Sequence, residues 1–123
     1  MPLHNKILIA DDDADMIELL SAMLEREGYT IIKAENGKEA VELARKELPA
    51  LIMLDIHMPV MDGLKACKAI KTDQVTKTIP VVMLTVEGSI SEIEQALSYG
   101  AKTYITKPSG RAEIIKVVKS LLS

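Results

Sequence analysis

Residues 51–55, LIMLD, decide the fold, because four apolar residues there are followed directly by Asp55. A short run rich in Ile, Val and Leu is typical of a strand that is buried on both faces of a sheet. Three further runs have this form, and each ends on a residue suited to binding metal or phosphate. They are ILIA at 7–10 before Asp11-Asp12-Asp13, VVML at 81–84 before Thr85, and TYIT at 103–106 before Lys107-Pro108.

Helical segments alternate with strands along the whole chain. Such alternation predicts a doubly wound α/β fold, in which five βα units surround one five-stranded parallel sheet. Two segments also have the form of a capping box that opens a helix, Asn36 with Glu39 and Ser89 with Glu92. A further strand is expected at 30–34. Five helices are also expected: the first after residue 13 and before Gly28, the second after 36 and before Pro49, the third from about 63 to Ile70, the fourth after 89 and before Gly100, and the fifth from 114 to 122.

Length and composition narrow the class of protein. At 123 residues the chain is expected to form one domain, 1–123, without a linker or an output domain. A net charge of −3, with no basic run, argues against direct binding to nucleic acid. No apolar stretch approaches the ~20 residues of a membrane span, and no signal peptide precedes the first strand. The single Cys67 suits a reducing, cytoplasmic location, with the thiol in the core.

The polar residues at the strand ends should meet at one edge of the sheet. In an open parallel sheet, ligands bind outside the carboxyl ends of the strands. Asp11, Asp12 and Asp55 would then make a cluster of hard oxygen ligands that suits Mg²⁺ or Mn²⁺. Without a cation the three charges repel one another, which raises the pKa of at least one carboxyl group. The simpler interpretation, that an aspartate caps the following helix, is retained for Asp13.

Lys107 and Thr85 complete the polar set at this edge. An ammonium group beside carboxylates could merely balance their charge, or it could clamp a transferring phosphoryl group. Aspartate is an established nucleophile that forms an aspartyl phosphate, as Asp55 could. A hydroxyl donor such as Thr85 can then hold one phosphoryl oxygen. Thr85 alone would be an ordinary residue at the end of a strand, but together with Asp55 and Lys107 it favours phosphoryl transfer.

The chain resembles the receiver domains of response regulators in bacterial two-component signalling, in the compact form of the stand-alone chemotaxis regulator. That family has a flavodoxin-like sheet with the strand order 2-1-3-4-5. The resemblance includes every strand end at which the polar residues lie. It is carried by ILIADD at 7–12, LDIHMPVMDG at 54–63, Leu84-Thr85, and GAKTYITKP at 100–108.

The resemblance implies a role for each residue of the acidic cluster. Asp55 would accept a phosphoryl group from a phosphohistidine on a sensor histidine kinase or a histidine phosphotransfer protein. Asp11 and Asp12 would hold Mg²⁺ together with Asp55 and the backbone carbonyl of His57, and Mn²⁺ would substitute. The protein would be a signalling domain rather than an enzyme, although it would assist its own phosphorylation and slow autodephosphorylation.

The resemblance also implies a conformational switch. Lys107, joined to Pro108 by a cis peptide bond, would pair with the phosphoryl group. Thr85 would turn toward a phosphoryl oxygen, and Tyr104 would move inward behind it. The movement would reshape the face made by the fourth helix, the fifth strand and the fifth helix, where a downstream protein docks and a homodimer could form. The alternative for Tyr104 is a tyrosine half buried at the edge of the sheet.

The chain departs from the family pattern near the phosphoryl pocket. Val86 stands where a very small residue is usual in the family, so its bulk would lie beside the phosphoryl pocket and change donor access or the rate of phosphorylation. Ser109 stands where a phenylalanine is common, which would alter the packing of the last helix. His57 and Glu87 each stand two residues beyond a strand-end site residue, at positions that in the family flank the path of attacking water. We hypothesise that this pair tunes the phosphoryl lifetime; the alternative is that His57 is only an exposed loop residue.

Other families fit the sequence less well. A haloacid-dehalogenase-type phosphatase needs a second aspartate where this chain has His57. In a flavodoxin-like electron carrier, the acidic run at 11–13 would repel the flavin phosphate, and a P-loop nucleotidase needs a glycine-rich loop that this sequence lacks. Two alternatives remain open: a receiver fragment of a longer transcriptional regulator, and a binding module that works without phosphorylation.

Overall fold

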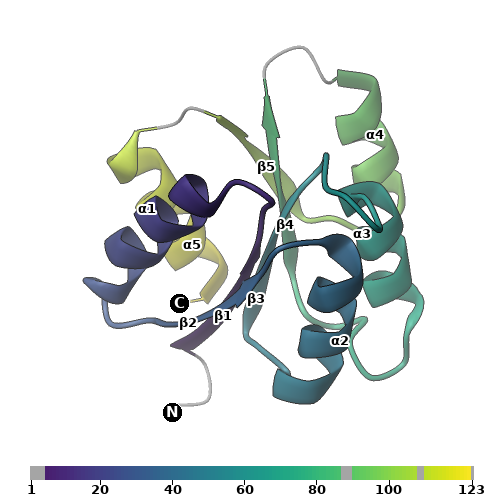
Figure 1. The fold of residues 1–123 in the computed structure, drawn as a ribbon, viewed down its shortest axis with the longest axis horizontal. Coiled ribbons are helices and arrows are strands. Elements are labelled where there is room, and N and C mark those ends of the chain that lie inside the picture. The colour runs from purple at the N-terminus through teal and green to yellow at the C-terminus, as the bar shows by residue number, and fades with distance from the viewer. Residues whose placement is uncertain (1–4, 87–89, 108–109, 123) are drawn as a thin grey trace.

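The computed structural model describes residues 5–86, 90–107 and 110–122. The chain forms one parallel sheet of five strands in the order β2-β1-β3-β4-β5 (Figure 1). The predicted doubly wound α/β fold and its strand order are therefore confirmed. The strands are β1 Lys6–Ala10, β2 Thr30–Ala34, β3 Leu51–Asp55, β4 Val81–Val86 and β5 Thr103–Lys107.

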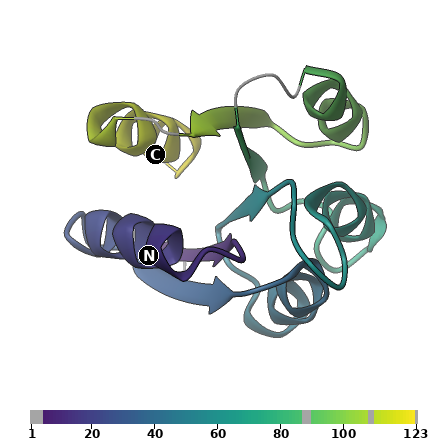
Figure 2. The ribbon, with the colours of Figure 1, turned by 45° about the horizontal axis from the view of Figure 1, so that its top comes forward.

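Helices cover both faces of the sheet. One face carries α1 and α5, and the other carries α2, α3 and α4, as the turned view in Figure 2 shows. No helix within the described ranges is long and apolar enough to cross a membrane. The helices are α1 Ala14–Glu25, α2 Gly37–Glu47, α3 Gly63–Thr72, α4 Ile90–Ser98 and α5 Arg111–Leu122.

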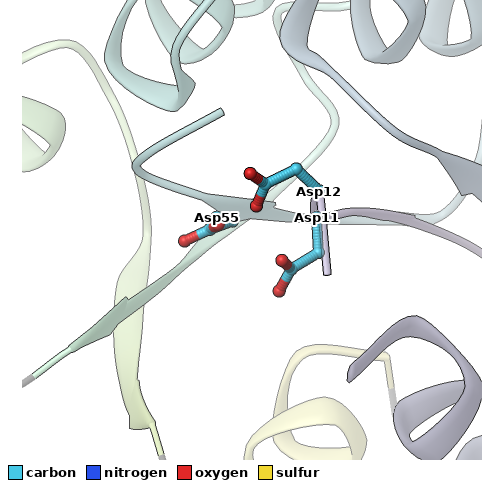
Figure 3. Close-up of side chains that lie close together, drawn as sticks. All are labelled: Asp11, Asp12 and Asp55. Atoms are coloured by element: carbon cyan, nitrogen blue, oxygen red, sulfur yellow. The ribbon is translucent and has the colours of Figure 1, made fainter. Parts of the chain in front are cut away.

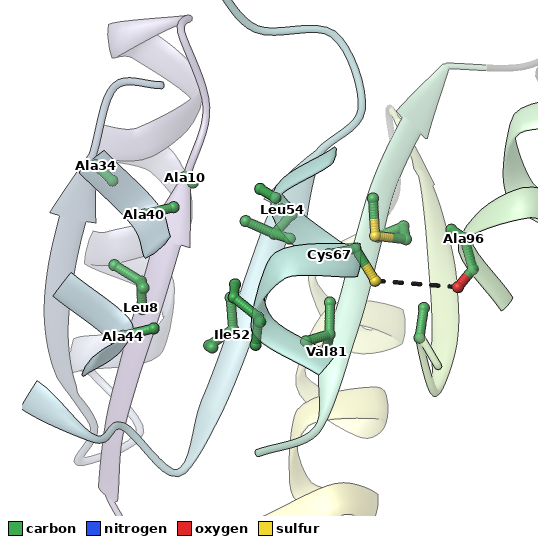
Figure 4. Packing of buried hydrophobic residues seen from close by; sticks show 14 of the residues in the cluster. Leu8, Ala10, Ala34, Ala40, Ala44, Ile52, Leu54, Cys67, Val81 and Ala96 are labelled. Atoms are coloured by element: carbon green, nitrogen blue, oxygen red, sulfur yellow. Dashed lines mark hydrogen bonds between the residues drawn. The ribbon is translucent and has the colours of Figure 1, made fainter. Parts of the chain in front are cut away.

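The central strand β3 supplies side chains to two hydrophobic clusters, one on each face of the sheet. Ile52 and Leu54 pack in the cluster beneath α2, α3 and α4, part of which Figure 4 shows. Leu51 and Met53 pack in the cluster beneath α1 and α5. This alternation follows from the two-residue period of a strand. Because all five residues of β3 are buried, the strand holds Asp55 at its end in a fixed position.

Cys67 is a core residue of α3, as the sequence predicts. The residue is fully buried, and its Sγ atom lies 4.0 Å from the carbonyl oxygen of Ala96 in α4 (Figure 4). Burial raises the pKa of the Cys67 thiol to about 11, so the thiolate is scarce at neutral pH. The residue therefore packs α3 against α4, and its chemistry is that of a small apolar side chain.

The first three helices open on side-chain caps. Asp13 accepts hydrogen bonds from two backbone N–H groups in the first turn of α1, which confirms its predicted capping role. Asn36 Oδ1 accepts a bond from the Glu39 N–H at 2.8 Å, but the Glu39 carboxylate accepts from the Glu35 N–H at 2.7 Å. In a capping box the Glu39 carboxylate would accept from the Asn36 N–H, whereas here it accepts from the N–H one residue earlier. Asp62 caps α3 by accepting a bond from a backbone N–H of that helix.

The loop between β3 and α3 is held at both ends by close backbone contacts. The Gly63 N–H donates to the Ile56 carbonyl at 2.7 Å, and the Gly37 N–H donates to the Met61 carbonyl at 2.9 Å. A Cβ atom at Gly63 would lie 2.1 Å from the Asp55 carbonyl oxygen, which leaves room only for glycine. The path of the chain just after Asp55 is thus fixed by packing against α2 and α3.

Candidate functional site

The carboxylates of Asp11, Asp12 and Asp55 lie together at the carboxyl edge of the sheet (Figure 3). Each offers an oxygen, and these oxygens lie within 4.8 Å of one another. The strands β1 and β3 are parallel neighbours in which Ala10 pairs with Leu54, so the next residue of each strand reaches the same edge. The structure therefore brings together the three carboxylates that follow these two apolar runs.

The three carboxylates differ in their access to water. Asp11 and Asp55 are buried, whereas Asp12 is exposed. One oxygen of Asp11, Oδ1, accepts a hydrogen bond from the Asp13 N–H at 3.0 Å, which orients the side chain at the start of α1. A cavity of about 310 Å³ adjoins Asp11 and Asp12. The cluster is thus anchored on one side and open to solvent on the other.

Lys107, the last residue of β5, places its ammonium group between the two buried carboxylates. Its Nζ atom lies 2.9 Å from Asp11 Oδ2 and 3.5 Å from Asp55 Oδ1. Burial by itself would lower the pKa of Lys107, but the hydrogen bond to Asp11 and the charges of Asp55 and Asp11 outweigh it and raise the pKa. Lys107 therefore stays charged in its position between the two buried carboxylates.

The pKa of Asp55 is raised from its ordinary value of 3.8 to about 6. The largest cause is burial, which disfavours the charged form, followed by the negative charge of Asp11. The positive charge of Lys107 acts in the opposite direction and only partly offsets these two effects. A raised pKa of this kind is the behaviour expected when carboxylates crowd together without a metal ion, and it is common at functional sites.

Thr85 lies at the end of β4, beside the carboxylate cluster. Its side chain is buried, and its hydroxyl donates to the carbonyl oxygen of Val86 at 3.1 Å. Val86 pairs with Lys107 across the β4–β5 ladder and is 52% exposed. The register therefore puts Thr85 and Val86 on the same edge as Lys107. To reach a phosphoryl oxygen, the Thr85 hydroxyl has to leave its present bond.

The donor set of the cluster fits a magnesium ion. Carboxylate oxygens are the ligands that Mg²⁺ prefers, and the ion usually keeps several waters. Asp11, Asp12 and Asp55 each offer such an oxygen, these oxygens lie within 4.8 Å of one another, and Asp12 is exposed to water. A divalent cation would also relieve the repulsion that raises the pKa of Asp55.

The side chain of His57 contacts α4. His57 follows β3 by two residues, is exposed, and places Nε2 3.2 Å from Glu92 Oε1 in the first turn of α4. Glu87, which the sequence hypothesis pairs with His57, lies outside the described residues. Ser89, the predicted capping partner of Glu92, does so too. Sequence reasoning missed the contact between His57 and Glu92, and their spacing in the chain contains no signal that would have revealed it.

Tyr104 lies in β5 with its side chain directed outward, at 44% exposure. It pairs with Met83 of β4, two residues before Thr85. This exposure fits both the predicted inward movement and the alternative of a tyrosine half buried at the edge of the sheet, so the movement stays a prediction. Pro108 and Ser109 lie outside the described residues, and so does the predicted cis peptide bond.

This fold and this cluster define the class of protein: the chain belongs to the response regulator receiver domain family, whose model matches residues 7–119. Members of this family are the receiver domains of two-component systems, and their standard function is to accept a phosphoryl group on an aspartate. They generally bind Mg²⁺ at an acidic pocket, and they interact with histidine kinases and downstream targets.

Particular relatives place the chain within that family. It is 36% identical over 118 residues to Protein PilH of Pseudomonas aeruginosa, covering 96% of this chain and 98% of PilH. It is 37% identical over 120 residues to the alkaline phosphatase synthesis transcriptional regulatory protein PhoP of Bacillus subtilis, covering 98% of this chain and 49% of PhoP. The chain thus spans nearly all of PilH but about half the length of PhoP.

Solved structures of similar receivers share the fold. The chemotaxis protein CheY4 of Vibrio cholerae matches with a TM-score of 0.89 and 31% identity, covering 95% of this chain and 98% of that one. The receiver domain of the sensor histidine kinase PA1611 from Pseudomonas aeruginosa matches with a TM-score of 0.89 and 27% identity, covering 96% and 97%. A magnesium ion is coordinated in the active site cleft of that second structure.

Proposed function

We propose that Asp55 is the phosphoacceptor of this receiver domain. A carboxylate oxygen of Asp55 would attack the phosphorus of a phosphohistidine. The N–P bond of the donor would break, with its electron pair left on the imidazole nitrogen. The observation that carries the proposal is the position of Lys107, whose ammonium lies 3.5 Å from Asp55 Oδ1 and so stands where negative charge would build on the phosphoryl oxygens.

The acidic cluster is proposed to hold the magnesium ion that this transfer needs. Asp11, Asp12 and Asp55 would supply carboxylate oxygens, and the His57 backbone carbonyl would supply a further ligand. When bound, Mg²⁺ offsets charge on the carboxylates and the phosphoryl group. The magnesium ion in the PA1611 receiver supports this assignment, because that domain shares the fold over nearly the whole chain. Mn²⁺, which also favours oxygen ligands, is proposed to substitute.

Phosphorylation is proposed to act through Thr85 and Tyr104. The Thr85 hydroxyl would exchange its bond to the Val86 carbonyl for a bond to a phosphoryl oxygen. That shift would leave space into which Tyr104, at present turned outward, could move. The surface of α4, β5 and α5 would then change shape for a downstream protein or for a second copy of the chain. The phosphoryl donor would be a cytoplasmic sensor histidine kinase or histidine phosphotransfer protein.

We further propose that residues 1–123 form a single receiver domain. All five βα units pack on one sheet with a buried cluster on each face, which supports one folding unit. After phosphorylation, this unit would slowly return the phosphoryl group to water without a partner enzyme. A role as a phosphorylation-independent binding module is less well supported, because the acidic cluster, Lys107 and Thr85 all meet at one edge.

Intact-mass spectrometry tests the proposal directly. The native protein and the Asp55→Asn variant are each incubated with acetyl phosphate and Mg²⁺, and a third sample of native protein is incubated with acetyl phosphate and EDTA. We expect the mass of one phosphoryl group to be added to the native protein only when Mg²⁺ is present. Phosphate on neither protein, or equal phosphate on both, would contradict the proposal.

A further inference from the structure

An open groove lies at the amino end of the sheet, opposite the edge that carries Asp55. It has a volume of about 430 Å³, and its lining residues all come from 48–50 and 75–80. These segments lead from α2 into β3 and from α3 into β4, so they meet where both strands begin (Figure 1). Leu48 and Val75 line the groove and are 53% and 45% exposed. Two large apolar side chains thus stand about half in water beside one groove.

Leu48 adopts a backbone conformation that leucine disfavours. It ends α2 with φ of 47° and ψ of 59°, in the left-handed region where glycine or asparagine is usual at the end of a helix. A leucine at this position strains the backbone and also leaves much of an apolar side chain in water. The exposed part gains nothing from the fold, so strain and exposure together indicate contact with another molecule.

Both sides of the groove are held in place by hydrogen bonds. The Val75 N–H donates to Asp73 Oδ1 at 2.8 Å, and the next residue, Thr76, is buried, so the turn presents Val75 outward. On the other side, the Ala50 N–H donates to the Lys6 carbonyl at 2.8 Å. A partner would therefore meet a preformed surface and would lose little binding energy to ordering it.

Basic side chains predominate around the groove. Lys46 and Lys77 are exposed and lie within two residues of lining residues. The Lys71 ammonium donates to the carbonyl oxygen of Ile79, which lines the groove, at 2.9 Å. Three positive charges therefore lie in or next to the segments that form this surface, although the whole chain carries a net charge of −3.

The nearby acidic residues are already paired with other bases. Glu47 Oε1 lies 3.2 Å from Lys6 Nζ, and Asp73 Oδ2 lies 3.1 Å from Arg45 Nε. Within the described part of the chain, no ion pair links an acidic side chain to any of the three lysines that adjoin the groove. The surface is thus complementary to a partner that carries carboxylates beside an apolar side chain.

We propose that this groove docks an acidic protein segment, with an apolar side chain of about leucine size packed between Leu48 and Val75. Carboxylates that flank this side chain in the segment would pair with Lys46 and Lys77. Because the groove and Asp55 lie at opposite ends of the strands, the segment would bind without covering the carboxylate cluster. The inference goes beyond the proposed function, since it gives the domain a second attachment surface that does not involve Asp55.

Two other occupants of the groove predict different results. If a second copy of the chain filled it, the mass measured by analytical ultracentrifugation would rise with protein concentration. If an anionic membrane covered it, the chain would sediment with phosphatidylserine vesicles. In both cases a polar residue in place of Leu48 would abolish the association.

The experiment follows peptide binding by NMR of the ¹⁵N-labelled full chain. The peptides are an acetylated nonapeptide with a central leucine between glutamates and a matched peptide with lysines in place of the glutamates. Leu48→Asn removes the apolar side chain but suits the left-handed backbone, so its stability in urea should stay near that of the native protein. Val75→Ser removes the second apolar contact. Leu19→Asn is the matched control, because Leu19 lies in α1 and is 58% exposed.

The charge of the groove is tested by a double variant, Lys46→Glu with Lys77→Glu. It should bind the glutamate peptide more weakly than the native protein and narrow the difference between the two peptides. Phosphorylation by acetyl phosphate should be unchanged in all the groove variants, because the groove lies away from Asp55. A double variant that binds the glutamate peptide as tightly as the native protein would overturn the proposed role of charge, and with it the inference.

We expect the glutamate peptide to shift the amide signals of 48–50 and 75–80, and the lysine peptide to leave them unchanged. Leu48→Asn and Val75→Ser should each weaken binding about fivefold, as expected when roughly half of an apolar side chain is no longer buried. Leu19→Asn should bind like the native protein. No binding of the glutamate peptide, equal binding of both peptides, or shifts centred outside the groove would overturn the inference. Self-association or vesicle binding that Leu48→Asn abolishes would overturn it as well, because the groove would then have another occupant.

Discussion

Lys107 Nζ lies closer to Asp11 Oδ2, at 2.9 Å, than to Asp55 Oδ1, at 3.5 Å. The cation is thus bonded chiefly to a residue of the proposed metal site while it remains within reach of the proposed phosphoacceptor. A magnesium ion that neutralises Asp11 would weaken this bond and leave the ammonium free to pair with an incoming phosphoryl group. If the proposed function holds, the lysine would link metal binding to phosphoryl transfer by exchanging Asp11 for the phosphoryl group as its partner.

Replacing Lys107 with methionine tests how far its charge stabilises the two buried carboxylates. The change keeps most of the side-chain length but leaves Asp11 and Asp55 without a positive charge. In EDTA we expect the free energy of unfolding to fall by about 2 kcal/mol, less than the ~3–5 kcal/mol of a fully buried pair, because Asp55 can take up a proton. Urea unfolding measures the loss, and saturating Mg²⁺ should reduce it.

The matched control is Lys6→Met, at the opposite edge of the sheet. Lys6 pairs with Glu47 at 3.2 Å, but both side chains are about one-third exposed, so this change should cost less than ~1 kcal/mol. Equal losses for the two lysine variants, or a loss in Lys107→Met that Mg²⁺ does not reduce, would show that Lys107 only contributes to packing.

The raised pKa of Asp55 makes the stability of the metal-free protein depend on pH. Between pH 3.8 and about 6 the folded state binds a proton on Asp55 that the unfolded state has lost, so stability falls as pH rises through this range. Asp55→Asn lacks this ionisation. In EDTA, we expect the variant to match the native protein near pH 4 and to be more stable by on the order of 2 kcal/mol above pH 6.5.

Urea unfolding of the native protein and of Asp55→Asn across this pH range gives the difference between their free energies of unfolding. Ionisations far from Asp55 cancel, so the change in the difference reports Asp55 together with the Asp11 carboxyl and the Lys107 ammonium that interact with it. A constant difference across the range would contradict the assigned pKa, and so would a native protein that gains on the variant as pH rises.

Gly63 is predicted to be essential for the shape of the chain after Asp55. A Cβ atom there would lie 2.1 Å from the Asp55 carbonyl oxygen, so Gly63→Ala must displace backbone. We expect a loss of about 2–3 kcal/mol in the free energy of unfolding, together with slower phosphorylation by acetyl phosphate. At Gly110 a Cβ atom would meet nothing within 4 Å, so Gly110→Ala serves as the control and should stay within ~0.5 kcal/mol of native.

Val60 adopts a left-handed backbone conformation in the loop between β3 and α3, with φ of 68°. This conformation costs a residue with a Cβ atom about 1–2 kcal/mol, while a glycine loses about 0.5–1 kcal/mol of chain entropy. Because Val60 is 77% exposed, few packing contacts are lost on its removal. We expect Val60→Gly to stabilise the fold by roughly 0.5 kcal/mol, measured by urea unfolding. Val75→Gly, at an exposed valine outside the left-handed region, should destabilise it.

The strands and the carboxylate cluster were predictable because burial on both faces of a parallel sheet leaves a clear pattern in sequence. Runs such as 51–54 have no polar side of their own, and the polar residue that ends each run must lie at the edge where all strands end. Asp11 and Asp55 could therefore be placed together although they are far apart in the chain. Asp13 was recognised as a cap because a capping side chain acts on its own neighbours.

The surface around the site could not be predicted in the same way. The partner of His57 depends on where α4 begins and how that helix packs, and neither is encoded in the local spacing of His57 and Glu92. The sequence also could not show that the Glu39 carboxylate accepts from the Glu35 N–H and not from the Asn36 N–H. The choice between these adjacent N–H groups depends on the rotamer of the Glu39 side chain. Roles that rest on movement, such as those of Thr85 and Tyr104, need a second state for comparison.

The identity of the modified aspartate is the most direct test of the account. The native protein is phosphorylated with acetyl phosphate and Mg²⁺, the acyl phosphate is reduced with borohydride to homoserine, and the digested peptides are sequenced by tandem mass spectrometry. Homoserine at position 55, and at neither Asp11 nor Asp12, is the predicted result. Homoserine at Asp11 or Asp12, or native sequence throughout after a reaction that adds phosphate to the intact chain, would contradict the assignment of Asp55.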